Sequence, residues 1–215
     1  MKKPFSAAFV LLALLALLAL LAPPAAAQVK TEIGAVGTWI HSTSTTVTDP
    51  AFDIGVKLEN GGGGGLLVDV RPWKIVSFEI SGFFTRQSAA ITASGSTLVA
   101  AGRLDATPVV LVAKFHFLGD GAFDPWVGGG ETYVFFQNLH DAGLDAAGIG
   151  VVTVKGKAGL VAAAGFRVGF SPHVSFLADG RYLAVRPDSE AASGSATTEL
   201  KWNPILVSAG FGFRF

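Results

Sequence analysis

The sequence predicts an all-β protein, an eight-stranded antiparallel transmembrane β-barrel, and three observations carry this prediction. Half of the 215 residues are hydrophobic and only 15% are charged, which is too apolar for an ordinary soluble surface. After the N-terminus, no apolar run approaches the roughly 18–20 residues that a membrane-spanning helix needs. Apolar residues alternate with small or polar ones at a period of two, between clusters of Gly, Pro, Ser, Asn and Asp, as in membrane barrels.

The N-terminal segment predicts an export signal. A basic pair, Lys2-Lys3, precedes an apolar run over residues 5–21, and Ala25-Ala26-Ala27 supplies a small-residue cleavage site. An uncleaved anchor helix is the alternative interpretation. We therefore expect a signal peptide over residues 1–27, cleaved near Ala27, followed by an outer-membrane barrel over residues 28–215.

The last predicted strand shows the alternation most clearly. From Ile205 to Phe215 every odd position is apolar, whereas the even positions include Ser208, two glycines and Arg214. A terminal Phe215 after alternating aromatics resembles the recognition signal of outer-membrane barrels, so the barrel-assembly machinery is an expected partner. Such aromatics also suit a membrane interface.

Eight strands and their connections follow from the same pattern. The strands are expected at residues 31–40, 65–72, 75–86, 104–118, 125–137, 156–170, 174–186 and 202–215. Short connections after the second, fourth and sixth strands alternate with long ones at about 41–64, 87–103, 138–155 and 187–201. Bacterial barrels place the short turns in the periplasm. We therefore expect a bacterial outer-membrane location, in contact with membrane lipid and lipopolysaccharide.

The glycine run Gly61–Gly65 is expected to be a flexible part of the first long loop. A phosphate-binding loop would need a following Gly-Lys-Ser/Thr and a helix, and the sequence has neither.

Three segments resemble the OmpW family of small outer-membrane barrels. They are ATPVVLVAKFHF at 106–117, DPWVGGG at 124–130, and the stretch from Trp202-Asn203-Pro204 to Phe215. Their order makes the case more than any single motif, and the match weakens before residue 65. The resemblance implies eight strands and passage of small hydrophobic molecules across the outer membrane.

The predicted strand directions sort the inward-facing side chains by height. Charged groups gather toward the periplasmic end, where we expect a polar plug in which opposite charges satisfy one another, because a buried charge needs a partner. A polar gate and an ion path are the alternatives. The expected plug residues are Asp69, Arg71, Glu79, Lys114, His116, Glu131, Arg167, Asp179, Arg181 and Arg214.

Apolar groups gather toward the extracellular end of the predicted interior. They either pack the lumen or form a hydrophobic pocket open to the outside, since a barrel of eight strands has room for side chains or one small ligand. The expected pocket residues are Phe83, Val110, Tyr133, Phe135, Val161, Leu183 and Leu206. Pro108 and Pro204 each lack a backbone N–H, so either is a candidate for a lateral opening into the membrane.

The function expected from these patterns is a narrow conduit or binding pocket for small hydrophobic molecules, with lateral release. A structural or adhesin-type barrel that acts through its extracellular loops is the alternative. An enzyme is not expected: the His-x-Ser spacing of His173 and Ser175 lies at a periplasmic turn without a third catalytic group. The sequence has no cysteine, no metal-ligand spacing, no implied cofactor, and no basic patch for nucleic acid.

Overall fold

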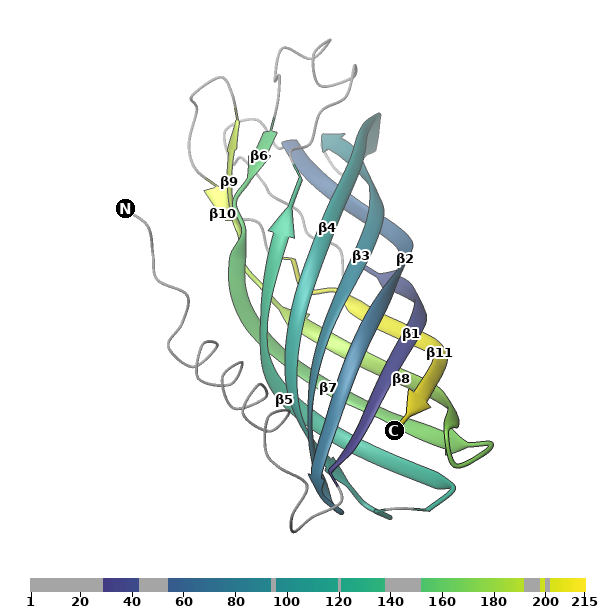
Figure 1. The fold of residues 1–215 in the computed structure, drawn as a ribbon. Coiled ribbons are helices and arrows are strands. Elements are labelled where there is room, and N and C mark those ends of the chain that lie inside the picture. Colours follow the sequence, from purple (N-terminus) through teal and green to yellow (C-terminus); the bar gives the residue numbers. More distant parts are fainter. Residues whose placement is uncertain are drawn as a thin grey trace.

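A computed structural model gives the fold and describes residues 29–42, 54–93, 96–119, 121–137, 152–191, 198–199 and 202–215. Eight strands form a closed antiparallel barrel in the order β1-β11-β8-β7-β5-β4-β3-β2 (Figure 1). They are β1 Lys30–His41, β2 Ile54–Trp73, β3 Val76–Ala93, β4 Ser96–His116, β5 Phe123–Phe136, β7 Lys157–Gly169, β8 Val174–Ala184 and β11 Ile205–Arg214. The predicted signal peptide lies outside the described residues.

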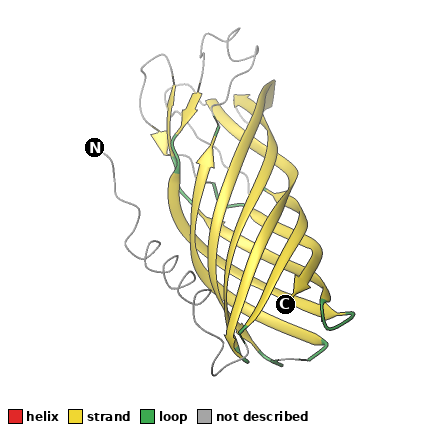
Figure 2. Ribbon diagram, viewed as in Figure 1, coloured by secondary structure: helices red, strands yellow, loops and turns green. Residues whose placement is uncertain are grey.

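The barrel closes where the first strand meets the last. β1 and β11 pair continuously from Glu32↔Arg214 to His41↔Ile205, and Phe215 N–H donates to the Thr31 carbonyl at 2.9 Å. Closure leaves no open sheet edge, which lipid could not solvate. The described part of the chain contains strands and loops (Figure 2), and it includes no helix long and apolar enough to cross a membrane.

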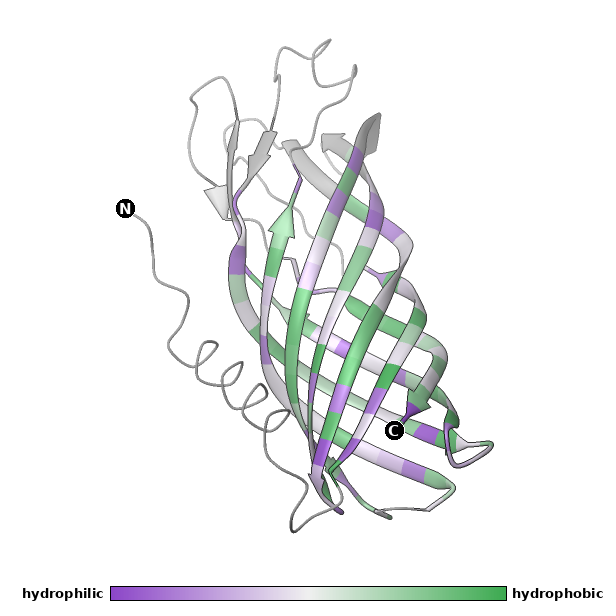
Figure 3. Cartoon of the chain, viewed as in Figure 1, coloured by the Kyte–Doolittle hydropathy of each residue, from purple (hydrophilic) through white to green (hydrophobic). Residues whose placement is uncertain are grey.

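The two faces of the wall differ as the alternation predicts. The outer face carries many large apolar side chains. Along each barrel strand, hydrophobic and hydrophilic residues are interspersed (Figure 3). Large exposed side chains on this face include Trp39, Leu66, Trp73, Phe84, Phe115, Phe123, Phe135, Phe170, Tyr182, Phe211 and Phe213. An apolar exterior with aromatic groups at its margins is what a barrel in lipid presents.

The glycine run is a strand, so the predicted loop is wrong. β2 begins at Ile54, and Gly61–Gly65 pairs with β1 on one side and β3 on the other, for example Gly63 with Thr38 and Thr85. The predicted loop at 87–103 is also shorter, since β3 runs to Ala93 and β4 starts at Ser96. Glycines have no side chains to alternate, so the run carries no period-two signal although its backbone pairs as a strand.

A second, small sheet lies at the end of the barrel opposite the short turns (Figure 1). It contains β6 Val152–Val154, β9 Asp188–Ala191 and β10 Thr198–Glu199, in the order β10-β9-β6. These strands fall within two predicted long connections, at 138–155 and 187–201. The long connections therefore pair with one another beyond the barrel wall.

Candidate functional site in the barrel interior

The interior has two chemically different tiers. The polar tier is built from inward positions near the short turns. Its charged and histidine members are Glu32, Asp69, Arg71, Glu79, Lys114, His116, Asp124, Arg167, Asp179, Arg181 and Arg214. This set has five cationic side chains and five carboxylates, so it can be neutral as a whole, as burial in low dielectric requires.

One ion-pair network crosses the lumen from β2 to β8. Lys114 Nζ lies 2.8 Å from Asp69 Oδ2 and also pairs with Glu79. Glu79 accepts from Arg181 Nη1 at 2.6 Å, and Arg181 in turn donates to both oxygens of Asp179, at 2.7 and 2.9 Å. Ser81 accepts a further bond from Arg181 at 2.8 Å. Each charged side chain in this network therefore has an oppositely charged partner within the barrel.

A second network lies beside it at the turn end. Arg71 Nη2 donates to Asp124 Oδ2 at 2.6 Å, and Arg71 Nη1 donates to the Gly119 carbonyl at 3.0 Å. His116 Nε2 lies 2.8 Å from Ser77 Oγ, which itself donates to Asp69. The serine hydroxyl must therefore accept from His116 Nε2–H. This contact joins the two networks into one.

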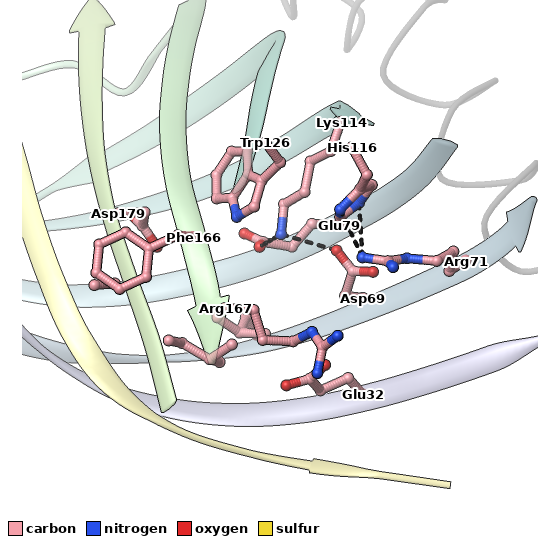
Figure 4. Close-up of a pocket in the computed structure, with 13 residues that line it drawn as sticks. Glu32, Asp69, Arg71, Glu79, Lys114, His116, Trp126, Phe166, Arg167 and Asp179 are labelled. Carbon is pink, nitrogen blue, oxygen red and sulfur yellow. Dashed lines mark hydrogen bonds and ion pairs between the residues drawn. The ribbon is translucent and has the colours of Figure 1, made fainter. Parts of the chain in front are cut away.

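The space left in the polar tier is small. A cavity of about 20 Å³ lies among Glu32, Asp69, Lys114, His116 and Arg167 (Figure 4). That volume suits about one water molecule. Arg167 lines this cavity, and its buried Nε–H has no hydrogen-bond acceptor in the protein, so a water molecule in the cavity would supply one. An organic solute would have to break ion pairs to pass.

The apolar tier fills the interior toward the extracellular end, and two of its residues, Leu67 and Leu177, reach down to line the polar cavity as well. Its buried members are Val36, Ile40, Leu58, Leu67, Phe83, Leu104, Ala106, Val110, Val112, Val134, Val161, Leu183, Val185, Trp202 and Leu206, with Phe136 and Leu177 packed against them. Of the predicted pocket residues, Phe83, Val110, Val161, Leu183 and Leu206 lie here. The Arg181 guanidinium, 4.9 Å from the centre of the Phe83 ring, marks the boundary between the tiers.

The predicted facing of β5 is wrong by one residue. Phe135 is 48% exposed on the outer face, and Tyr133 lies beside it there, with ring centres 4.7 Å apart. Glu131, predicted in the plug, also faces outward, opposite Leu111 and Leu160. A one-residue shift turns every side chain of a strand to the other face. Both faces of this strand carry glycine, an aromatic and one carboxylate, so its own alternation could not decide.

The even residues of β5 face inward instead, and sequence reasoning missed them. Asp124 is fully buried against Arg71, and Trp126 lies under Lys114, whose Nζ is 4.3 Å from the ring. Glu32 was also missed: it accepts from Ser175 and lies 3.3 Å from Arg214 Nη2. Counting charges could have indicated one missing carboxylate, because the predicted plug had five cationic side chains and four carboxylates.

The two prolines differ in what surrounds them. In the described β3–β4 ladder, pairing runs to Gly82↔Val109 and resumes in the same register at Thr85↔Ala106, so the ladder lacks its pairs where Phe83 and Phe84 lie opposite Pro108 and Thr107. The β11–β8 ladder begins at Ile205↔Tyr182, directly after Pro204, and the Pro204 carbonyl accepts from Leu183 N–H at 3.1 Å. The gap at Pro108 therefore lies within a ladder, whereas Pro204 lies at the end of one.

The His-x-Ser pair of the sequence serves structural contacts. His173 Nδ1 donates to the Arg214 carbonyl at 3.0 Å and its ring stacks on Phe213, whereas Ser175 is buried and donates to Glu32. The histidine and serine thus serve separate contacts. Within the described ranges, no three His, Asp or Glu side chains are placed to hold a metal ion.

A closed barrel of eight strands with an apolar exterior and a filled interior defines the class: this is a small outer-membrane β-barrel protein. The OmpW family model matches residues 74–215. The chain therefore belongs to the OmpW family, and its location is the outer membrane.

Relatives and solved structures agree with that assignment. An outer-membrane protein of Sinorhizobium fredii, y4mB, is 27% identical over 154 residues, a match that spans 66% of each chain. OprG of Pseudomonas aeruginosa shares the fold with a TM-score of 0.78 at 16% identity, over 87% of this chain and 96% of that one. AlkL in lipid bilayers has a TM-score of 0.66 at 16% identity, over 100% and 97%. Outer membrane protein W of E. coli has a TM-score of 0.52 at 16% identity, over 87% and 98%.

Proposed function

We propose that this barrel is a conduit for small hydrophobic molecules, which enter the apolar tier from outside and leave sideways into the membrane. The observation that carries the proposal is that three features adjoin one another: the apolar tier, the ion-pair network and the gap in the β3–β4 ladder. The apolar tier ends below on a neutral network of ion pairs, and beside it on the interrupted β3–β4 ladder. An apolar solute in the upper interior therefore meets a barrier beneath and a weak seam at its side.

The barrier below favours a sideways exit. Passage downward would separate Glu79 from Arg181 and Lys114, each of which is buried. Leaving a buried charge without its partner costs about 3–5 kcal/mol, and an apolar molecule offers nothing in return.

Two buried hydroxyl groups hold β4 on either side of Pro108. Thr85 Oγ1 donates to the Ala106 carbonyl at 2.7 Å, and Thr132 Oγ1 donates to the Val109 carbonyl at 3.1 Å. Pro108 itself has no N–H to donate to β3. The weak part of the seam is therefore confined to the stretch between these two anchored residues.

Two neighbouring phenylalanines line a route across this seam. Phe83 and Phe84 occupy the unpaired stretch of β3; Phe83 is buried in the apolar tier and Phe84 is exposed on the outer face. The path from interior to lipid is therefore apolar on both sides of the wall.

The test compares uptake of an apolar solute and a polar solute of similar size. The refolded barrel would be placed in vesicles whose outer leaflet contains lipopolysaccharide, which slows direct partitioning. We expect selective entry of the apolar solute, loss of that entry in Val110→Asp, and retention in the matched control Val110→Ile. Equal or absent entry of both solutes would contradict transport and direct attention to a structural or adhesive role of the loops.

The lateral exit has its own test. Pro108→Ala restores a backbone N–H that can pair with β3, so uptake into the membrane should fall several-fold while the polar solute stays excluded. Pro204→Ala is the matched control, because Pro204 lies at the end of the β11–β8 ladder, where its carbonyl already accepts from Leu183 N–H. Equal effects of the two substitutions would remove Pro108 as the exit.

A further inference from the structure

Trp202 spans the upper interior from one wall to the opposite one. It lies just before β11, exchanges backbone hydrogen bonds with Val185, and is 1% exposed. Its indole Nε1–H donates to Gln87 Oε1 at 3.0 Å, and its ring packs edge-on against Phe136 with centres 5.2 Å apart. Since β8 and β3 lie on opposite sides of the closed barrel, this one side chain crosses the lumen.

A second hydrogen bond fixes the orientation of the Gln87 amide. Gln87 is 1% exposed, and its Nε2 donates to the Glu59 carbonyl at 3.1 Å. A carbonyl can only accept, so the amide nitrogen must face Glu59 and the amide oxygen must face the lumen. Any group that replaces the indole therefore meets an acceptor and no donor.

The residue that pairs with Gln87 on the neighbouring strand has no side chain. Gly61 is the β2 partner of Gln87, and a Cβ atom at position 61 would overlap the Arg86 carbonyl and lie 2.8 Å from Gln87 Cγ. Glycine at this position lets the backbone approach closely enough for Gln87 to hold its place. The amide and the apolar groups around it thus form a shaped site that the indole fills.

We propose that this site binds the transported molecule, and that the preferred ligand is a ring-sized apolar compound with one hydrogen-bond donor. The ligand displaces the Trp202 ring, packs against Phe136, and donates to Gln87 Oε1 in place of the indole. A compound without a donor would leave the buried amide oxygen unpaired, and a site with such a group rejects ligands that cannot satisfy it. This inference rests on the proposed conduit and adds the chemistry of its cargo.

The test uses two isomers, 3-methylindole and 1-methylindole, which have the same atoms but differ in having a free N–H. Each would be titrated into the full barrel in lipid nanodiscs, following the Trp202 indole N–H resonance, which is assigned by its absence in Trp202→Phe, and the interior methyl resonances of Val110 and Leu183. We expect 3-methylindole to bind about fivefold more tightly. In Gln87→Leu the ratio should fall to about one, and Trp39→Phe, on the outer face, should leave it unchanged.

Trp202→Phe provides a second variant should Gln87→Leu fail to fold. It removes the donor that competes for Gln87 Oε1, so 3-methylindole should bind more tightly than to the wild type and 1-methylindole should gain less. Equal binding of the isomers with shifted interior methyls would overturn the donor preference and leave the conduit standing. Unshifted interior methyls with both isomers would overturn the conduit as well.

Discussion

The two tiers occupy the same barrel wall, and they are held together in opposite ways. The polar tier is a connected network in which Arg181 alone contacts Glu79, Ser81 and Asp179. The apolar tier is held by non-directional packing, with one side-chain hydrogen bond from Trp202 to Gln87 across it. Removing one member of a network leaves its partners unpaired, whereas an apolar contact can be replaced by another apolar group.

This difference explains why the polar tier can block a solute and the apolar tier can let one pass. Ligand atoms can substitute for Leu183 or Trp202 with little change in chemistry. Nothing apolar can substitute for Lys114, which lies between two carboxylates. The barrel is therefore expected to be rigid below Phe83 and exchangeable above it.

The largest effect is expected in the polar tier. Glu79→Gln removes the carboxylate that pairs with both Arg181 and Lys114, so the barrel should lose about 4 kcal/mol of unfolding free energy. Urea titration of the refolded protein in vesicles would measure it, with uptake of the apolar solute recorded alongside. A loss below about 1 kcal/mol would show that the tier is not tightly coupled.

The next effect belongs to the apolar tier and sharpens the contrast. Leu183→Ala removes a fully buried side chain and should cost about 3 kcal/mol. Unlike Glu79→Gln, it enlarges the proposed passage, so uptake of the apolar solute should rise. The same titration and uptake assay apply, and a fall in uptake would place Leu183 outside the path.

A smaller effect is expected from the glycine strand. Gly61→Ala would push a methyl group into the Arg86 carbonyl and should cost about 2 kcal/mol. Gly62→Ala is its matched control, because a Cβ there has 3.6 Å to its nearest neighbour, the Thr38 carbonyl. Comparing their urea midpoints tests whether the run is shaped by close approach; equal midpoints would mean that it is not.

The smallest effect is expected outside both tiers. Arg86 and Asp105 form a two-point ion pair on the outer face, with Arg86 52% exposed. Because β3 continues well beyond Arg86 to Ala93, we place this pair above the lipid, where water screens it. Asp105→Asn should therefore leave the urea midpoint unchanged within error at both low and high salt. A shift as large as that of Glu79→Gln would mean that burial is not what separates the tiers.

The sequence by itself determined the architecture. Residues 205–215 alternate strictly, and the short turns after β2, β4 and β7 recur between such segments, because a strand with lipid on one face must show a period of two. The same alternation correctly places a set of side chains inside the barrel, among them Glu79, Lys114, Arg181, Val110 and Leu183.

Only the tertiary structure decided what alternation cannot encode. β5 has similar residues on both faces, and its facing was set by pairing with β4 and β7 rather than by its own pattern. The glycine run has no side chains to alternate, yet both neighbouring strands pair with it. Trp202 and Gln87 are 115 residues apart, and closure of the barrel brings them together across the lumen. Local sequence records which face a residue prefers, whereas contacts across a closed barrel depend on the register of every strand between them.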